Sequence, residues 1–335
     1  MLVHYFKYSL IVTVTGLLLA WWWGGNVALF LAAILAVMEI GLSFDNAVMN
    51  AAVLRRMDAV WQRYFLTWGM VIAVFGMRLL FPIAIVAVVT GQSLAEVTLL
   101  ALHDPGEYAR RLTSTHVQIS AFGGMYLMLV FFSFIFNDEK ELHWLGWMER
   151  QLGRLGKLES IEVIMALVTL IVAQGFLPAD DKLPALLAGL WGIILYVLVG
   201  SVSALFGSAQ QLGKGAGAGF VSFIYLQLLD ASFSFDGVIG AFAISKDIVI
   251  IMLGLSIGAM FVRSLTVMLV QKGTLDEYLF LEHGAHYAIG SLALIMLIGM
   301  VSHVSELATG LIGLGFILLS LWSSILYRRR NGNDA

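Results

Sequence analysis

The chain has 335 residues, of which 60% are hydrophobic and only 12% are charged, and its mean hydropathy is +0.91. This composition excludes a soluble globular domain and is typical of a polytopic membrane protein. Because the chain contains no cysteine, structural disulfides and thiolate metal sites are excluded, which disfavours zinc, copper(I) and iron–sulfur chemistry.

Apolar runs long enough to cross a hydrocarbon core about 30 Å thick recur along the chain, separated by short polar breaks. We predict an all-α polytopic membrane protein with about ten transmembrane helices. The expected spans are residues 8–24, 26–54, 64–90, 117–137, 160–177, 184–207, 218–243, 247–271, 286–303 and 306–327. The first run resembles a signal peptide, but three tryptophans, Trp21, Trp22 and Trp23, stand where a cleavage site needs small residues. They are typical of an interfacial anchor, so this run is interpreted as a span.

The distribution of basic residues predicts the orientation. With both termini in the cytoplasm, ten spans place thirteen lysines and arginines inside and four outside, namely Arg110, Arg111, Lys182 and Lys246. This asymmetry follows the positive-inside rule and supports a multi-pass protein with both termini in the cytoplasm. The membrane we expect for it is the bacterial inner membrane. Residues 328–335 are then a cytoplasmic tail.

Two connecting segments stand out. Residues 91–115 form the largest external loop, where His103, Asp104 and Glu107 could be taken for a second metal site, but a solvated turn is the preferred interpretation. Residues 138–159 mix leucines and tryptophans with basic residues, which predicts an amphipathic linker helix on the cytoplasmic face.

Two carboxylates, Glu39 and Asp45, lie inside the second apolar run. A charged side chain near the bilayer centre costs at least about 2.5–3.5 kcal/mol, so it normally faces a protein interior and serves a function. Residues 229–239 repeat the pattern of residues 38–48. The equivalent positions are Glu39 and Asp230, Ser43 and Ser234, Phe44 and Phe235, and Asp45 and Asp236.

The similarity continues beyond the acidic stretches. Each half also carries an arginine, Arg78 or Arg263, followed by a histidine, His116 or His283. Five spans in each half would give the halves opposite polarity, which is the inverted repeat of many secondary transporters, with a substrate site near the membrane midplane. We therefore predict two inverted five-helix repeats, the first at residues 1–137 and 160–177 and the second at residues 184–327.

The acidic stretches offer only hard oxygen donors. On a regular helix Glu39, Ser43 and Asn46 share a face, whereas Asp45 points about 120° away, so convergence on one ion requires a break near Gly41 to Ser43. Four carboxylates, two serines and one amide suit Mn²⁺, Mg²⁺ or Ca²⁺. Some carboxylates must be protonated when the site is empty, and metal binding should then release protons.

Supporting roles are predicted for two arginines and two histidines. Arg78 and Arg263 are interpreted as counter-charges to the acids, the alternative being long side chains that snorkel or cap a kink. Pro82 removes the donor that would bind the carbonyl of Arg78, so a local kink is expected there. For His116 and His283, both near span ends, interfacial placement and proton handling remain open.

The pattern Glu39-x-x-Leu42-Ser43-x-Asp45-Asn46 resembles a motif of the TerC family of membrane proteins, which includes the Alx-type manganese exporters and tellurite-resistance proteins. The second stretch, Asp230-x-x-Phe233-x-x-Asp236, is similar to that family's second acidic motif, and the resemblance extends over roughly residues 26–327. It implies a Mn²⁺ exporter that binds metal at Glu39, Asp45, Asn46, Asp230 and Asp236.

The chain departs from the TerC pattern at two positions. Gln227 stands where an acid is expected three residues before Asp230, and Gly237 stands where a small hydroxyl residue is frequent. Gln227 is retained as a candidate metal ligand through its amide, and the chain looks like a divergent TerC-like branch.

The predicted function is proton-coupled export of a divalent cation, Mn²⁺ first, by a protein that is not an enzyme and uses no cofactor. Its expected partners are the metal ion and the lipid bilayer, and no nucleic acid. Two other classes of protein are the alternatives. An intramembrane aspartyl protease would use Asp45 and Asp236 as a dyad, but its Gly-x-Gly-Asp motif is absent. A non-transporting scaffold in an envelope or metal-stress complex, such as one for tellurite resistance, is the main alternative.

Overall fold

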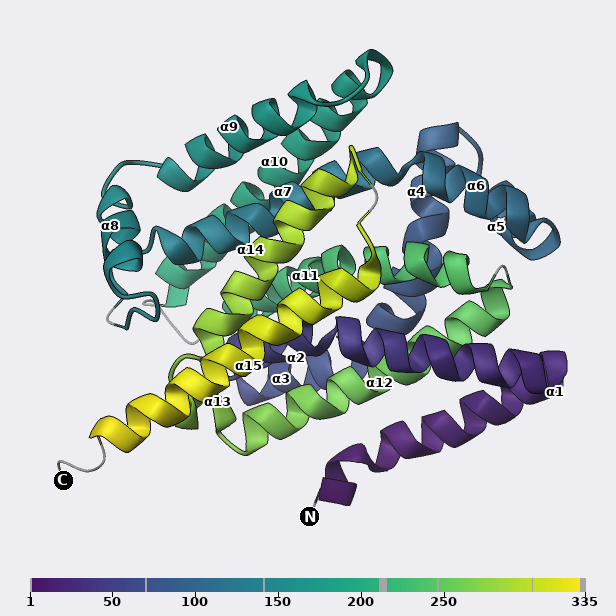
Figure 1. Cartoon of the computed structure of the whole chain (residues 1–335), viewed down its shortest axis with the longest axis horizontal. Helices are drawn as coiled ribbons and strands as arrows, with labels where there is room; N and C mark the ends of the chain where they lie inside the picture. The colour runs from purple at the N-terminus through teal and green to yellow at the C-terminus, as the bar shows by residue number, and fades with distance from the viewer. Residues whose placement is uncertain are drawn as a thin grey trace. The chain divides into compact units, whose positions relative to one another are not determined.

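The computed structural model describes residues 2–69, 71–140, 142–210, 216–245, 247–302 and 304–331, and throughout these ranges the chain forms helices joined by short connections (Figure 1). The predicted all-α class is confirmed for this part of the chain, in which no residue lies in a strand. Lys246, residues 332–335 of the tail, and the side chains of Ser234 and Asp236 lie outside the described part.

The chain divides into two compact units. The first contains Met1–His116 and Ala216–Gly273, and the second contains Val117–Gly215 and Thr274–Ala335. Each unit therefore combines a segment from the first half of the chain with one from the second. The acidic stretches both belong to the first unit.

Helix α1 (Leu2–Leu42) is a hairpin of two arms. Gly24 and Gly25 leave the helical conformation, and Gly25 has φ +68°, a value that glycine adopts without strain. Figure 1 shows the purple helix turning back on itself at the end marked α1. The reversal lies between the first two predicted spans. A second break follows at Ser43, where α1 ends and α2 (Phe44–Leu54) begins.

The third predicted span is a helix with widened turns. It consists of α3 (Ala59–Tyr64), the π-helical segments η1 (Phe65–Gly69) and η2 (Ile72–Leu80), and α4 (Phe81–Thr90). Segment η2 ends two residues before Pro82, which cannot donate to the carbonyl of Arg78. Wide π turns occur frequently at functional sites.

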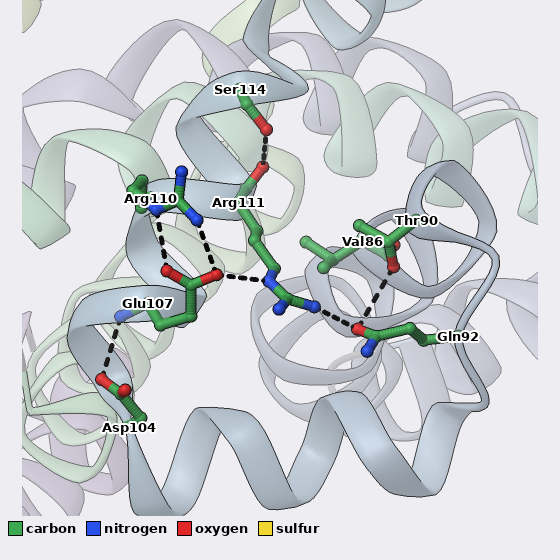
Figure 2. A network of polar contacts seen from close by, with 8 residues as sticks. All are labelled: Val86, Thr90, Gln92, Asp104, Glu107, Arg110, Arg111 and Ser114. Carbon is green, nitrogen blue, oxygen red and sulfur yellow. Dashed lines mark hydrogen bonds and ion pairs between the residues drawn. The ribbon is translucent and has the colours of Figure 1, made fainter.

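The predicted external loop forms a helical hairpin, α5 (Leu94–His103) and α6 (Pro105–Ser114), with Asp104 at the turn. Figure 2 shows how it is fastened to the end of α4: Arg111 donates both to Glu107, at 2.8 Å, and to the side-chain oxygen of Gln92. Arg110 also donates to Glu107, at 2.7 and 2.8 Å. The Asp104 side chain accepts the Glu107 N–H, so both acids serve the hairpin.

Helices α11 (Ala216–Ile244) and α12 (Ile248–Gln271) complete the first unit. Helix α12 packs closely on the second arm of α1 through Gly254 and Gly258, four residues apart. A Cβ at Gly254 would lie 2.5 Å from the Cβ of Leu35 and 2.9 Å from the carbonyl oxygen of Ala32. Small residues spaced in this way let membrane helices approach backbone to backbone.

The second unit contains α7 from Val117 onward, α8, α9, α10, α13, α14 and α15. Their bounds are His116–Ile135, Trp147–Leu155, Ile161–Gly175, Ala179–Gln210, Thr274–Glu277, Leu281–Gly299 and Glu306–Asn331. Helix α14 packs on α7 and α15: a Cβ at Gly124 would lie 3.2 Å from Leu297, and one at Gly284 would lie 2.2 Å from the Ser320 hydroxyl.

Within the described ranges, six helical stretches are long and apolar enough to cross a membrane. They are Tyr5–Leu42, His116–Ile135, Ala179–Val202, Ile248–Gln271, Leu281–Gly299 and Ala308–Arg330, and shorter apolar helices occur at Leu94–His103, Ile161–Gly175 and Gly219–Phe233. These helices indicate a multi-pass membrane protein. The count of ten spans and their inverted arrangement stay predictions.

Candidate functional site

Glu39 and Arg78 form a buried ion pair in the first unit. Glu39 is 1% exposed and Arg78 is 6% exposed. The Oε1 atom of Glu39 accepts a hydrogen bond from the Arg78 guanidinium and another, at 3.0 Å, from the hydroxyl of Ser43. An arginine within an apolar span therefore neutralises the first of the acids.

Two glycines make room for the Glu39 side chain. A Cβ at Gly258 of α12 would lie 2.4 Å from the Cβ and 2.5 Å from the Cγ of Glu39, so only glycine fits there without movement. Gly237 of α11 lies against the second carboxylate oxygen of Glu39, because a Cβ on it would be 3.0 Å from Oε2. The second acidic stretch thus borders the Glu39 carboxylate.

A direct hydrogen bond joins the two acidic stretches. The side-chain amide of Asn46 in α2 donates to the Asp230 carboxylate of α11 at 2.6 Å, and both residues are buried. Asn50, one helical turn later and also buried, is a further hydrogen-bonding neighbour of Asp230. The sequence reasoning missed Asn50, although a second amide four residues after Asn46 on the same helix face was a usable signal.

A local break in the helix at Ser43 lies between Glu39 and Asp45. Ser43 has φ −104° and ψ 17°, yet its N–H still donates to the Glu39 carbonyl and its own carbonyl accepts the Ala47 N–H. These carbonyls are therefore occupied within the helix. The buried Asp45 carboxylate accepts the Asn46 backbone N–H at 2.9 Å in the first turn of α2.

The described site carries an excess of negative charge. Glu39, Asp45 and Asp230 contribute three carboxylates and Arg78 one positive charge, which leaves −2 when all are ionised. Nowhere in the described ranges do three or more histidine or acidic side chains come close enough together to form a metal centre. The side chains of Ser234 and Asp236, which the sequence adds to the predicted ligand set, lie outside these ranges.

Gln227 is a buried amide on the same helix as Asp230. It is 5% exposed, and neither of its polar side-chain atoms has a hydrogen-bond partner in the described structure. Its Nε2 lies beside Gly69 of η1, at 2.8 Å from the position that a Cβ there would occupy. Since a buried polar group without a partner is costly, this amide is available to a bound species.

Arg263, the sequence equivalent of Arg78, lies in a different environment. Its guanidinium donates to the backbone carbonyl of Leu66 in η1, so among the described residues this arginine contacts the widened turn.

The two histidines are also unlike each other in position. His116 is the first residue of α7. His283 belongs to the second unit, where its Nε2 lies 3.0 Å from the Leu142 carbonyl and 3.6 Å from Glu149. The structure therefore brings together Glu39, Ser43, Asn46, Asp230 and Arg78 through direct bonds, while His283 has other partners.

Fold and site together define a multi-pass helical membrane protein with a buried cluster of carboxylates and amides. The chain belongs to the family described as "Protein of unknown function (DUF475)", whose profile matches residues 44–331. This range includes Asp45, Asn46 and Asp230, whereas Glu39 precedes it. Comparison with curated proteins and with solved structures gave no match. The resemblance to the TerC family stays a prediction.

Proposed function

We propose that this protein is a membrane transporter that exports divalent metal cations, Mn²⁺ first among them, from the bacterial cytoplasm in exchange for protons. The observation that carries the proposal is the presence of three buried carboxylates in the first unit, Glu39, Asp45 and Asp230, against one buried counter-charge, Arg78. Uncompensated charge inside a membrane protein is costly, so the excess must be balanced by protons or by a cation.

The excess of two charges on Glu39, Asp45, Asp230 and Arg78 supports exchange. One divalent cation neutralises it, and so do two protons. Because carboxylates bind metal in the deprotonated form, metal binding at such a site releases protons, and protonation releases metal. Alternate occupancy by the two kinds of cation is the chemical basis of antiport.

The donor atoms support a hard cation. Carboxylates and amides, namely those of Asp45, Asn46, Asp230 and Gln227, favour Mn²⁺, Mg²⁺ or Ca²⁺ over softer metals. We assign Ser43, Ser234 and Asp236 to the same ligand set from the repeated motif. Glu39 and Arg78 adjust its charge. The resemblance to the TerC family favours Mn²⁺ among these ions.

The proposed architecture is two inverted five-helix repeats that meet at the site, at residues 1–137 with 160–177 and at residues 184–327. The Asn46–Asp230 bond supports it, because it joins the two stretches that the repeat makes equivalent. Secondary transporters of this design bind their substrate between the repeats near the membrane midplane.

The test is Mn²⁺ flux into proteoliposomes, recorded together with lumenal pH. We expect flux with opposing proton movement, and its loss in Asp45→Asn and in Asp230→Asn. The control is Asp180→Asn, which removes the same charge at the exposed start of α10 and should transport normally.

Three results would change the proposal. Flux of Ca²⁺ or Mg²⁺ without Mn²⁺ would keep the site and overturn the metal. Mn²⁺ flux that both substitutions leave intact would overturn the site. No divalent flux from folded protein would overturn transport and favour the membrane scaffold.

A further inference from the structure

The cytoplasmic linker holds a short helix, α8, at the ends of two membrane helices. A Cβ at Gly156, just after α8, would lie 1.7 Å from the carbonyl oxygen of Phe136, directly after the candidate span α7. A Cβ at Gly153 would lie 3.4 Å from the Asn137 carbonyl oxygen. The apolar helix α9 begins at Ile161, and Figure 1 shows α8 beside the ends of α7 and α9. Helix α8 is therefore fixed at the level where these helices end.

The inner face of α8 is fastened by one carboxylate, Glu149, which is fully buried. It accepts the backbone N–H groups of Trp144 and Leu145, each at 3.2 Å, and the hydroxyl of Tyr287 in α14 at 3.0 Å. Lys140 forms an ion pair with it at 3.2 Å. Burial alone would raise the pKa of Glu149, but the Leu145 N–H and the Lys140 charge outweigh it and lower that pKa. The anchor stays charged at neutral pH, so α8 presents a constant outer face.

The outer face of α8 combines exposed apolar and basic side chains. Trp147, Met148 and Leu155 are 73%, 42% and 44% exposed, and at 100° per residue they lie within about 100° of one another. Arg150 and Arg154, also exposed, border this strip on the side of Trp147. Just beyond the helix, Lys157 and Leu158 add one further residue of each kind.

This pattern identifies the partner by its chemistry. A tryptophan-containing apolar strip bordered by arginines suits the boundary between headgroups and acyl chains, where the basic groups attract anionic lipids. The attachment of α8 to the end of a candidate membrane span places the strip next to lipid. An apolar protein partner would leave the arginines unpaired.

We propose that α8 is a docking surface for anionic phospholipid headgroups, which Arg150, Arg154 and Lys157 bind while Trp147, Met148 and Leu155 enter the bilayer boundary. This inference concerns the second unit and is independent of the transport proposal. It makes the contacts of the outer face of α8 dependent on the lipid composition of the membrane.

The experiment uses the complete protein in nanodiscs. Since the chain has no cysteine, Met148→Cys provides a single attachment point for an environment-sensitive fluorophore. Spectra are recorded in phosphatidylcholine alone and with increasing phosphatidylglycerol, with and without a lipid-borne quencher. We expect a blue shift and quenching that grow with the anionic fraction and weaken in high salt.

Two matched charge variants decide the result. Arg150→Gln with Arg154→Gln should weaken the association of α8 with the anionic bilayer by about 30-fold. Arg329→Gln with Arg330→Gln removes the same charge from the exposed end of α15 and should leave the signal unchanged. All four arginines are exposed, so these variants should fold, and thermal unfolding verifies this.

Three outcomes would overturn the proposal. The first is equal quenching in neutral and anionic nanodiscs. The second is an equal loss of signal in both charge variants. The third is a fluorophore shielded from water but not reached by the lipid-borne quencher, which would indicate a protein contact at this surface.

Discussion

Removing Arg78 should destabilise the protein more than removing its partner Glu39. Both side chains are buried, and taking away one partner of a buried pair costs about 3–5 kcal/mol, because the other charge is left uncompensated. Arg78→Gln changes the charge of the described cluster from −2 to −3, whereas Glu39→Gln changes it from −2 to −1. The arginine variant should therefore lie at the upper end of this range and the glutamate variant at or below its lower end.

The double variant Glu39→Gln with Arg78→Gln separates pairing from packing. It restores the charge of −2 and leaves two amides of similar size, so its loss of stability should be smaller than the sum of the single losses by several kcal/mol. Thermal unfolding in one detergent, followed by tryptophan fluorescence, ranks the four proteins. The loss of stability caused by Arg78→Gln should become smaller as the pH falls, because a proton on a neighbouring carboxylate replaces the missing positive charge.

An exposed pair supplies the control. Glu277 and Arg328 form an ion pair at 2.8 Å, with side chains 48% and 64% exposed. Glu277→Gln should change the stability by about 0.5 kcal/mol or less. If the effects of Glu39→Gln and Arg78→Gln were additive, or if Arg78→Gln were the milder variant, the two groups would not be a coupled pair and the account of the site's charge would be refuted.

Two further features can be tested on their own. Gly258→Ala should destabilise the protein by about 1–3 kcal/mol through overpacking, because the new methyl would lie 2.4 Å from the Glu39 Cβ. The control is Gly41→Ala, which has nothing within 4 Å and should be neutral or stabilising in the same unfolding assay. Equal effects of the two substitutions would contradict the packing argument. The α5–α6 hairpin should stay ordered down to about pH 4. Arg110 and Arg111 lower the pKa of Glu107 from 4.5 to about 2, so its ion pairs persist below the ordinary pKa and are lost only as the pH falls through about 2. A spin label on Thr113→Cys measures this order, and mobilisation at pH 4 to 5 would show that Glu107 does not fasten the hairpin.

Local signals in the sequence were sufficient to predict where the helices reverse or break. The two glycines at 24 and 25 fall between two apolar runs, and the structure reverses direction there. A break near Gly41 to Ser43 was expected from the need to turn Asp45, and the structure has it at Ser43. Such features depend on residues close in sequence, so periodicity and glycine placement can indicate them.

Partners across the fold could not be predicted in the same way. The repeat made Arg78 and Arg263 equivalent, yet one contacts a carboxylate and the other the Leu66 carbonyl. Sequence equivalence fixes the position on a helix, but a long side chain bonds whatever group the neighbouring helix presents. For the same reason the recess at Gly258 and the buried Glu149 anchor could be recognised only when α12 and α14 were in place.

The three described carboxylates have different hydrogen-bond partners, and this difference predicts how many protons are exchanged for each Mn²⁺ ion. Glu39 is paired with a full positive charge, whereas Asp45 and Asp230 accept hydrogen bonds from neutral amides of the Asn46 backbone and side chain. Neutral donors orient a carboxylate without cancelling its charge, so the two aspartates carry the exchangeable negative charge. If the protein transports as proposed and these two groups carry the exchange, one divalent ion replaces two protons. The ratio of proton movement to Mn²⁺ flux in the same vesicles should then be about two, and a ratio near three would mean that a further carboxylate, Glu39 or Asp236, takes part in the exchange.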